Sequence, residues 1–303
     1  MANQKKISSR ILLPEVVTKI KNLELIARHI VEGFLVGLHK SPFHGFSVEF
    51  SQHRQYMPGD SIRHIDWKVY AKTTRYYIKQ YEEETNVNAY LLLDISGSMG
   101  YQSTTVNKLQ YATYLAAALA YLMLKQRDAI GMATFSREMR LFLPAKSTPS
   151  YLKLILRQLN ALQAEPEISS ISETMHKMAE KIKRRGLILL FSDFLFEPPE
   201  AILQGLQHFR YYGHEVLVFN ILDPRDASFE FGDEATFIDL ETTESLKTHP
   251  LFLMEEYRKQ FDEFIGTLQN QCRQMQIDFE TIFTDESFDK ALLKYLVKRQ
   301  KLY

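Results

Sequence analysis

The sequence predicts an α/β protein: a doubly wound, mostly parallel sheet preceded by an N-terminal β-rich subdomain. From Asn88 onward, short continuous apolar segments alternate with longer amphipathic ones, which is the pattern of a parallel sheet covered by helices on both faces. Before about residue 86, aromatic and β-branched segments alternate with turn signals instead. With about 150 residues per domain, a chain of 303 residues is expected to hold roughly two. We place them at residues 1–86 and 87–303.

The N-terminal region is expected to contain one short helix, Pro14 to Lys21, followed by extended segments. Gly45–Phe50 and Arg75–Tyr81 are rich in aromatic and β-branched residues, and the second alternates as a strand does. Turn signals at Ser41-Pro42 and Pro58–Asp60 separate these segments. These features predict a small β-rich unit with a single helix.

The second region is expected to alternate strands and helices. The strand candidates are short apolar runs: Ala89–Leu93, Ala129–Phe135, Leu187–Phe191, Glu215–Leu222 and Asp278–Phe283. The helix candidates between them are Lys108–Gln126, Ser150–Leu162, Ile171–Arg184 and Pro199–Tyr212. A further strand at Met139–Leu143 is expected as an antiparallel edge, and Pro250–Gln276 as a long amphipathic helix.

Composition excludes several classes of protein. Lys plus Arg and Asp plus Glu are both 37, so the formal net charge is zero, and we expect no nucleic-acid partner. The single cysteine, Cys272, excludes an intramolecular disulfide and a multi-thiolate metal site. The most apolar run lies between Lys108 and Lys125 and is shorter than the ~20 residues that span a bilayer. Since no secretory signal is readable either, we expect a cytoplasmic protein without direct membrane insertion.

The first strand of the α/β region ends in oxygen-bearing side chains. Asp94, Ser96 and Ser98 are spaced i, i+2, i+4, so in an extended segment they point to one side. Ligands of open α/β sheets bind beyond the carboxyl ends of the strands, and Asp193 follows the neighbouring strand candidate. One carboxylate and two hydroxyls suit Mg²⁺ or Mn²⁺. A plain turn and helix cap would also place Asp and Ser here.

These residues carry a family resemblance. The Asp94-x-Ser96-x-Ser98 pattern resembles the metal-ion-dependent adhesion site of von Willebrand factor A domains. Other stretches are similar to the bacterial family of such domains filed as domain of unknown function 58, which is associated with MoxR-type ATPases: Gly45–Phe50, Tyr56–Asp60, Arg63–Trp67 and Lys181–Asp193. The similarity runs from about residue 20 to the C-terminus, and it implies a von Willebrand A-like fold for residues 87–303.

The resemblance implies a cation held by three loops. The first loop would supply Asp94, Ser96 and Ser98, and the third Asp193 through a water molecule. The family's second loop supplies a Thr, whose position falls here on Ser169; Ser170 is the fallback, and Thr174 lies too far into the following helix. Because Glu167-Ile168 replaces the family's glycine-led approach to that position, the resemblance does not fix the path of this loop.

The function implied by the resemblance is recognition, not catalysis. A cation with one direct carboxylate keeps positive charge and attracts an acidic side chain from a protein partner. The family resemblance suggests a MoxR-type AAA+ ATPase as that partner, in chaperone-like maturation of other proteins. The ATPase would be a separate chain, since this one has no Gly-x-x-x-x-Gly-Lys-Ser/Thr phosphate loop. We therefore expect a non-enzymatic, cation-dependent interaction module.

Two other interpretations stay open. The Ser96–Gly100 stretch resembles a nucleophile elbow, which would make the chain a serine hydrolase with Ser98 as nucleophile and a histidine such as His208, His214 or His249 as base. In that case Asp193 or Asp223 would orient the base, while Asp94 and Ser96 would have no assigned role. The second interpretation is a scaffold with a vestigial metal site, suggested by the altered second loop.

Overall fold

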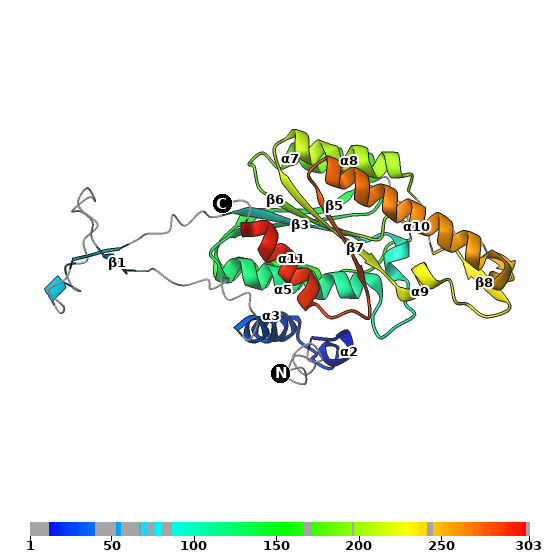
Figure 1. The fold of residues 1–303 in the computed structure, drawn as a ribbon, viewed down its shortest axis with the longest axis horizontal. Coiled ribbons are helices and arrows are strands. Elements are labelled where there is room, and N and C mark those ends of the chain that lie inside the picture. The colour runs from blue at the N-terminus through cyan, green and yellow to red at the C-terminus, as the bar shows by residue number, and fades with distance from the viewer. Residues whose placement is uncertain are drawn as a thin grey trace.

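The computed structural model describes residues 12–39, 53–55, 67, 70–71, 76–79, 87–166, 171–195, 197–240 and 245–300. Its centre is a six-stranded sheet in the order β10-β7-β6-β3-β4-β5 (Figure 1). The strands are β3 (Asn88–Asp94), β4 (Ala129–Phe135), β5 (Met139–Lys146), β6 (Leu187–Ser192), β7 (Glu215–Leu222) and β10 (Asp278–Phe283). β5 is antiparallel to β4, and the other neighbours are parallel. The predicted α/β class with a mostly parallel sheet is confirmed, including the antiparallel edge.

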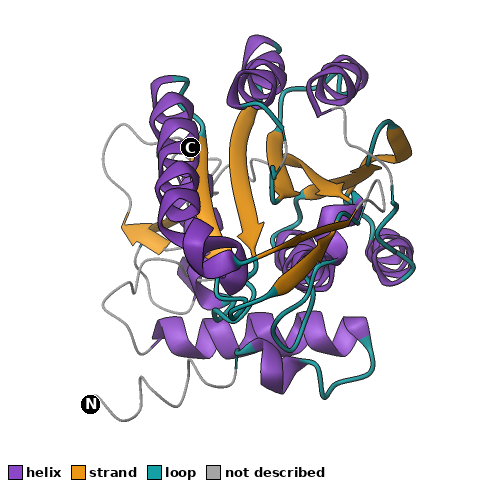
Figure 2. Cartoon of the chain, turned by 90° about the vertical axis from the view of Figure 1, so that its right-hand side faces the viewer, coloured by secondary structure: helices purple, strands orange, loops and turns teal. Residues whose placement is uncertain are grey.

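Helices cover both faces of this sheet (Figure 2). One side carries α2 (Pro14–Val17), α3 (Leu23–His39), α5 (Lys108–Lys125), α6 (Pro149–Asn160) and α11 (Asp289–Gln300). The other side carries α7 (Ile171–Lys181), α8 (Pro199–Tyr211) and α10 (Pro250–Gln274). Successive residues of the central strands alternate between the two cores, so both faces of each strand must be apolar. None of the helices described here is long and apolar enough to cross a membrane.

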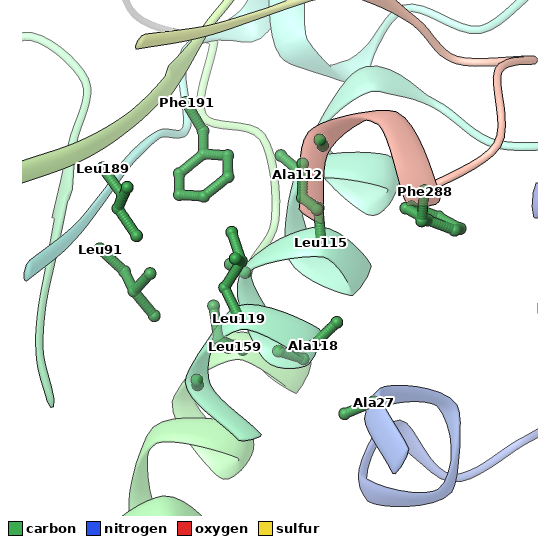
Figure 3. Packing of buried hydrophobic residues seen from close by; sticks show 14 of the residues in the cluster. Ala27, Leu91, Ala112, Leu115, Ala118, Leu119, Leu159, Leu189, Phe191 and Phe288 are labelled. Atoms are coloured by element: carbon green, nitrogen blue, oxygen red, sulfur yellow. The ribbon is translucent and has the colours of Figure 1, made fainter. Parts of the chain in front are cut away.

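α5 is the central helix of the larger core. Ala112, Leu115 and Leu119 belong to the same cluster as Phe191 of the sheet, while Ala118 and Ala27 of α3 lie on the outer side of the helix (Figure 3). The helix is therefore covered by the sheet on one side and by other helices on the other. This double burial explains why its sequence is apolar nearly all round, as a buried helix requires.

The N-terminal region differs from the expectation of one short helix. α2 ends at Val17, and a second helix of 17 residues, α3, follows and packs on α5. Two three-residue strands, β1 (His53–Gln55) and β2 (Tyr77–Lys79), pair antiparallel. The expected strand Gly45–Phe50 lies outside the described residues. The β-rich subdomain and the boundary at residue 86 stay predictions.

A short helix and a hairpin near the carboxyl end of the sheet were not predicted. The short helix α9 (Pro224–Ser228) follows β7, and a hairpin of β8 (Ala235–Ile238) and β9 (Ser245–Thr248) leads into α10. Tyr257 of α10 donates a hydrogen bond to the backbone oxygen of Asp226 at 2.8 Å and stacks on Phe229, with ring centroids 4.1 Å apart. These contacts fix α9 against α10.

Candidate metal centre at the carboxyl edge of the sheet

The candidate site forms where two neighbouring parallel strands end. β3 and β6 pair in register, with Leu93 opposite Phe191, so Asp94 lies beside the end of β6. Both strands are almost wholly buried, which fixes their register and the position of the side chains at their ends. The predicted residues Asp94, Ser96, Ser98 and Asp193 are thereby brought together.

Asp94 is buried and held by two donors. The backbone amide of Ser96 donates to its Oδ1 at 2.9 Å, and the Ser192 hydroxyl donates to its Oδ2 at 2.5 Å. Burial raises the pKa of Asp94 to about 7, and the nearby carboxylate of Asp193 adds to the shift, while these hydrogen bonds oppose it. The charged form of Asp94 is thus disfavoured by its burial and by a neighbouring carboxylate.

A chain of hydroxyls joins the end of β3 to the end of β6. The Ser96 and Ser98 hydroxyls are 3.2 Å apart, and the Ser98 hydroxyl donates to Asp193 Oδ1 at 3.2 Å. All three residues are buried. The 3₁₀ turn Gly97–Gly100 begins directly after Ser96 and carries Ser98 back over the strand ends.

Lys108 is a member of the site that the sequence analysis did not predict. Its ammonium donates to Asp193 Oδ2 at 2.6 Å and to Asp226 Oδ2 at 3.1 Å, although the residue is fully buried. Burial opposes its charge, but Asp193 and Asp226 outweigh that effect and raise the pKa of Lys108 above its ordinary value. No local signal identifies this role, since the partners lie 85 and 118 residues away in sequence.

Asp223 and Asp226 extend the acidic cluster along α9. They form a capping box: Arg225 N donates to Asp223 Oδ1 at 2.9 Å, and Asp223 N donates to Asp226 Oδ2 at 2.8 Å. The Ser103 amide also donates to Asp223 Oδ2 at 2.8 Å, and its hydroxyl donates to Oδ1. Burial is the main reason that the pKa of Asp226 is raised. The Asp-Pro-x-Asp pattern after β7 is the sequence signal that could have predicted this cap.

The second loop is described only at its two ends. Ser169 and the fallback Ser170 lie outside the described residues. On the near side, Glu165 forms a parallel bridge with Ser96, and its amide donates to Ile95 O at 2.7 Å. On the far side, α7 begins at Ile171 as predicted, and the Thr174 hydroxyl donates to Arg137 O at 2.9 Å. The loop therefore leaves from a point beside the candidate site.

The hydrogen bonds of the Ser98 side chain go to Ser96 and Asp193, not to the histidines considered as a catalytic base. His214 is buried just before β7, at the amino end of the sheet, whereas Ser98 lies at the carboxyl end. His208 packs against His176 between α8 and α7, with ring centroids 4.3 Å apart. His249 precedes α10, and its Nδ1 is 3.1 Å from Asp233 O.

The donor set suits a hard cation bound by oxygen. Within the described ranges, no three His, Cys, Asp or Glu side chains are grouped so as to hold a metal, so any cation here would need serine hydroxyls as well. Asp94 and Asp193 supply two buried carboxylates. Ser96 and Ser98 supply two hydroxyls, which are hydrogen-bonded to each other and, through Ser98, to Asp193. Carboxylate and hydroxyl oxygens fit Mg²⁺ or Mn²⁺ and disfavour softer metals.

Comparison with known proteins places the chain in a family. Residues 52–267 match the family described as "Protein of unknown function DUF58". The uncharacterized proteins Mb1516 of Mycobacterium bovis and Rv1480 of Mycobacterium tuberculosis are each 26% identical over 228 residues, which cover 73% of this chain and 69% of theirs.

Two solved structures are similar to parts of this chain. An aerotolerance-related membrane protein from Bacteroides fragilis superposes with a TM-score of 0.50 at 17% identity, covering 70% of this chain and all of that one. The VWA domain of SpRpn10 is similar with a TM-score of 0.42 at 8% identity, over 70% of this chain and 95% of that domain. The first of these likenesses supports the α/β architecture described above. Because the sequence match at residues 52–267 spans most of the chain, the protein belongs to the DUF58 family.

Proposed function

We propose that this chain is a divalent-cation-dependent protein-interaction module. The observation that carries the proposal is the convergence of Asp94, Ser96, Ser98 and Asp193 at the carboxyl edge of the sheet, linked by hydrogen bonds and buried. Mg²⁺ or Mn²⁺ is the proposed cation, held by the first three residues, with Asp193 acting through water and Ser169 contributing from the second loop. When bound, the cation supplies a positive centre for an acidic side chain of a partner.

The charge of the site supports this proposal. Asp94, Asp193, Asp223 and Asp226 bring four carboxylates to one edge of the sheet, all buried or nearly so, and Lys108 contacts two of them, Asp193 and Asp226. Burying carboxylates without counter-charge is costly. A divalent cation would offset part of that excess, and with Asp94 as its one direct carboxylate ligand it would itself stay positively charged toward a partner's acidic side chain.

The proposed partner is a MoxR-type AAA+ ATPase, and the proposed role is that of an adaptor in chaperone-like protein maturation. This part of the proposal comes from the family resemblance. The chain's own residues would bind and orient the cation, so that no covalent step is required of Ser98. Its hydroxyl already donates to Asp193, which leaves it hydrogen-bonded to a carboxylate instead of to a histidine.

The test is Mn²⁺ titration by calorimetry of the wild type, Asp94→Asn and Asp262→Asn. Asp94→Asn keeps the volume of the side chain but removes a buried charge, and we expect it to lose Mn²⁺ affinity by at least about tenfold. Asp262 is exposed on α10, so the control substitution should leave binding unchanged. Equal binding by wild type and Asp94→Asn would contradict the proposed site, and absence of binding by the wild type would favour the scaffold interpretation.

The interaction itself is tested with the purified ATPase. We expect it to be retained by the immobilised wild type in Mg²⁺, released by a chelator and not retained by Asp94→Asn. If the ATPase is retained in the presence of the chelator and also by Asp94→Asn, the contact is not bridged by a metal. Ester hydrolysis that is lost in Ser98→Ala would favour the serine hydrolase instead.

A further inference from the structure

Lys108 is placed where a lysine is costly. It is the first residue of α5, where the partial positive charge of the helix dipole opposes a cation, and Asn107 already caps the helix by accepting from Gln110 N at 2.6 Å. Its side chain is also 1% exposed. Neither helix capping nor solubility explains a lysine at this position. The contacts of its ammonium with carboxylates are the remaining explanation.

The two carboxylates that Lys108 contacts come from different parts of the sheet edge. Asp193 follows β6 and also accepts from Ser98, while Asp226 lies on α9 and is held by the backbone of Asp223. Lys108 therefore shares Asp193 with the hydroxyl chain that leads to Asp94. Any cation that binds among those oxygens interacts with a carboxylate that is already neutralised in part.

We infer that Lys108 is a built-in counter-cation that shares Asp193 with the divalent cation and thereby sets how tightly that cation binds. The inference rests on the proposed function of the site. The ammonium keeps one oxygen of Asp193 occupied and places a positive charge beside the metal, and both effects weaken binding. The site would therefore bind a cation weakly enough for it to exchange. The bound cation would keep positive charge that attracts a partner's acidic side chain.

The alternative is that Lys108 only joins the loop after β6 to α9. In that case its removal would lower stability and would leave metal affinity unchanged or reduce it. Removing one partner of a buried pair leaves an uncompensated charge, so a loss of stability alone does not separate the two roles. The readout must therefore be cation affinity.

The experiment compares Mn²⁺ affinity by calorimetry in the wild type, Lys108→Met and Lys108→Arg. We expect Lys108→Met to bind Mn²⁺ roughly tenfold tighter or more, because it removes a positive charge from the contact with Asp193. Lys108→Arg keeps the charge and should bind with nearly the wild-type affinity. A second variant, Lys108→Met with Asp226→Asn, removes one charge of each sign and should fold even if Lys108→Met does not; it should still bind Mn²⁺ more tightly than the wild type because Asp193 is freed, but with a smaller gain because a nearby carboxylate is lost as well.

Lys298→Met is the matched control. Lys298 is likewise mostly buried and bridges two carboxylates, Glu215 at 2.9 Å and Asp278 at 3.0 Å. Those residues begin β7 and β10, at the opposite end of the sheet from the candidate site. This variant should lose stability without any change in Mn²⁺ affinity.

The possible outcomes separate the inference from the function on which it rests. Wild-type binding with unchanged or weaker binding by both Lys108→Met variants would overturn the role of Lys108 and leave the proposed cation site standing. Binding by a Lys108→Met variant but not by the wild type would support the lysine as a counter-cation and overturn the proposed function. Binding by none of these proteins would overturn both.

Discussion

Gly186 lies where a side chain would collide with the backbone of the neighbouring central strand. It immediately precedes β6, and a Cβ atom built on it would lie 2.2 Å from the carbonyl oxygen of Asn88, the first residue of β3. Only a residue without a side chain allows that approach. The carboxyl ends of these same strands carry Asp94 and Asp193, so the spacing set at Gly186 also positions the candidate site.

We expect Gly186→Ala to lower the free energy of unfolding by about 1–3 kcal/mol, because the added methyl group must push β3 and β6 apart. Urea denaturation measures the change. Gly266→Ala is the control: Gly266 lies within α10 with open space around it, and alanine there should stabilise by about 0.5–1 kcal/mol through helix propensity. Similar effects of the two substitutions would show that β3 and β6 can accommodate a side chain at position 186.

At the scale of single residues, the sequence predicts a residue of the candidate metal site only where that residue follows a recognisable strand. Asp94, Ser96 and Ser98 share one segment, and Asp193 follows an unmistakable apolar run, so that their meeting at the sheet edge could be inferred. Lys108 could not, because a lysine at the edge of an apolar helix usually reaches solvent. Its burial depends on two carboxylates that only the tertiary fold brings to it.

At the scale of elements, burial decides which ones the sequence reveals. The strands β4, β7 and β10 have the predicted bounds. For β4 and β7 the reason is a continuous apolar run, which fits few structures other than a buried strand. α3 was missed although its buried positions repeat at helical spacing, as Leu23, Ile26, Ala27, Ile30, Val31 and Phe34 show. The hairpin β8–β9 could not be recognised, since its short strands are largely exposed and carry no apolar run.

The packing of α3 on α5 gives a prediction for that helix. Ile30 is fully buried in the larger core, and we expect Ile30→Ala to destabilise the protein by about 2–5 kcal/mol through the lost burial and the cavity left behind. Val36 on the same helix is 55% exposed, so Val36→Ala should change stability by less than about 0.5 kcal/mol. Thermal unfolding of both variants tests this. An unaffected Ile30→Ala protein would mean that α3 contributes little to the domain.

For the whole molecule, a buried histidine gives stability a dependence on pH. Burial lowers the pKa of His214 below its ordinary value near 6.5, so below that pH the unfolded chain binds a proton that the folded chain resists. Stability contributed by keeping His214 neutral is complete above about pH 6.5 and is lost as the pH falls below it.

We therefore expect the free energy of unfolding to fall less steeply between about pH 6.5 and pH 5 in His214→Gln than in the wild type. Urea titrations at several pH values measure the two slopes. His249→Gln provides the control, since His249 is exposed before α10 and its substitution should leave the slope unchanged. Identical slopes in wild type and His214→Gln would assign the acid sensitivity to other groups.

The position of α5 between the sheet and helices from both ends of the described chain has a consequence for synthesis. α3 precedes it in sequence, whereas Phe288, Ala291 and Tyr295, which belong to the same core, follow it by more than half the length of the protein. The amide of Phe288 also donates to the carbonyl of Leu12 at 3.3 Å. A nascent chain on the ribosome thus carries a long alanine- and leucine-rich helix that remains partly uncovered until these last residues emerge. Folding of this core must therefore finish after α11 has been translated. A chain stalled before that point would expose apolar surface that is prone to aggregation.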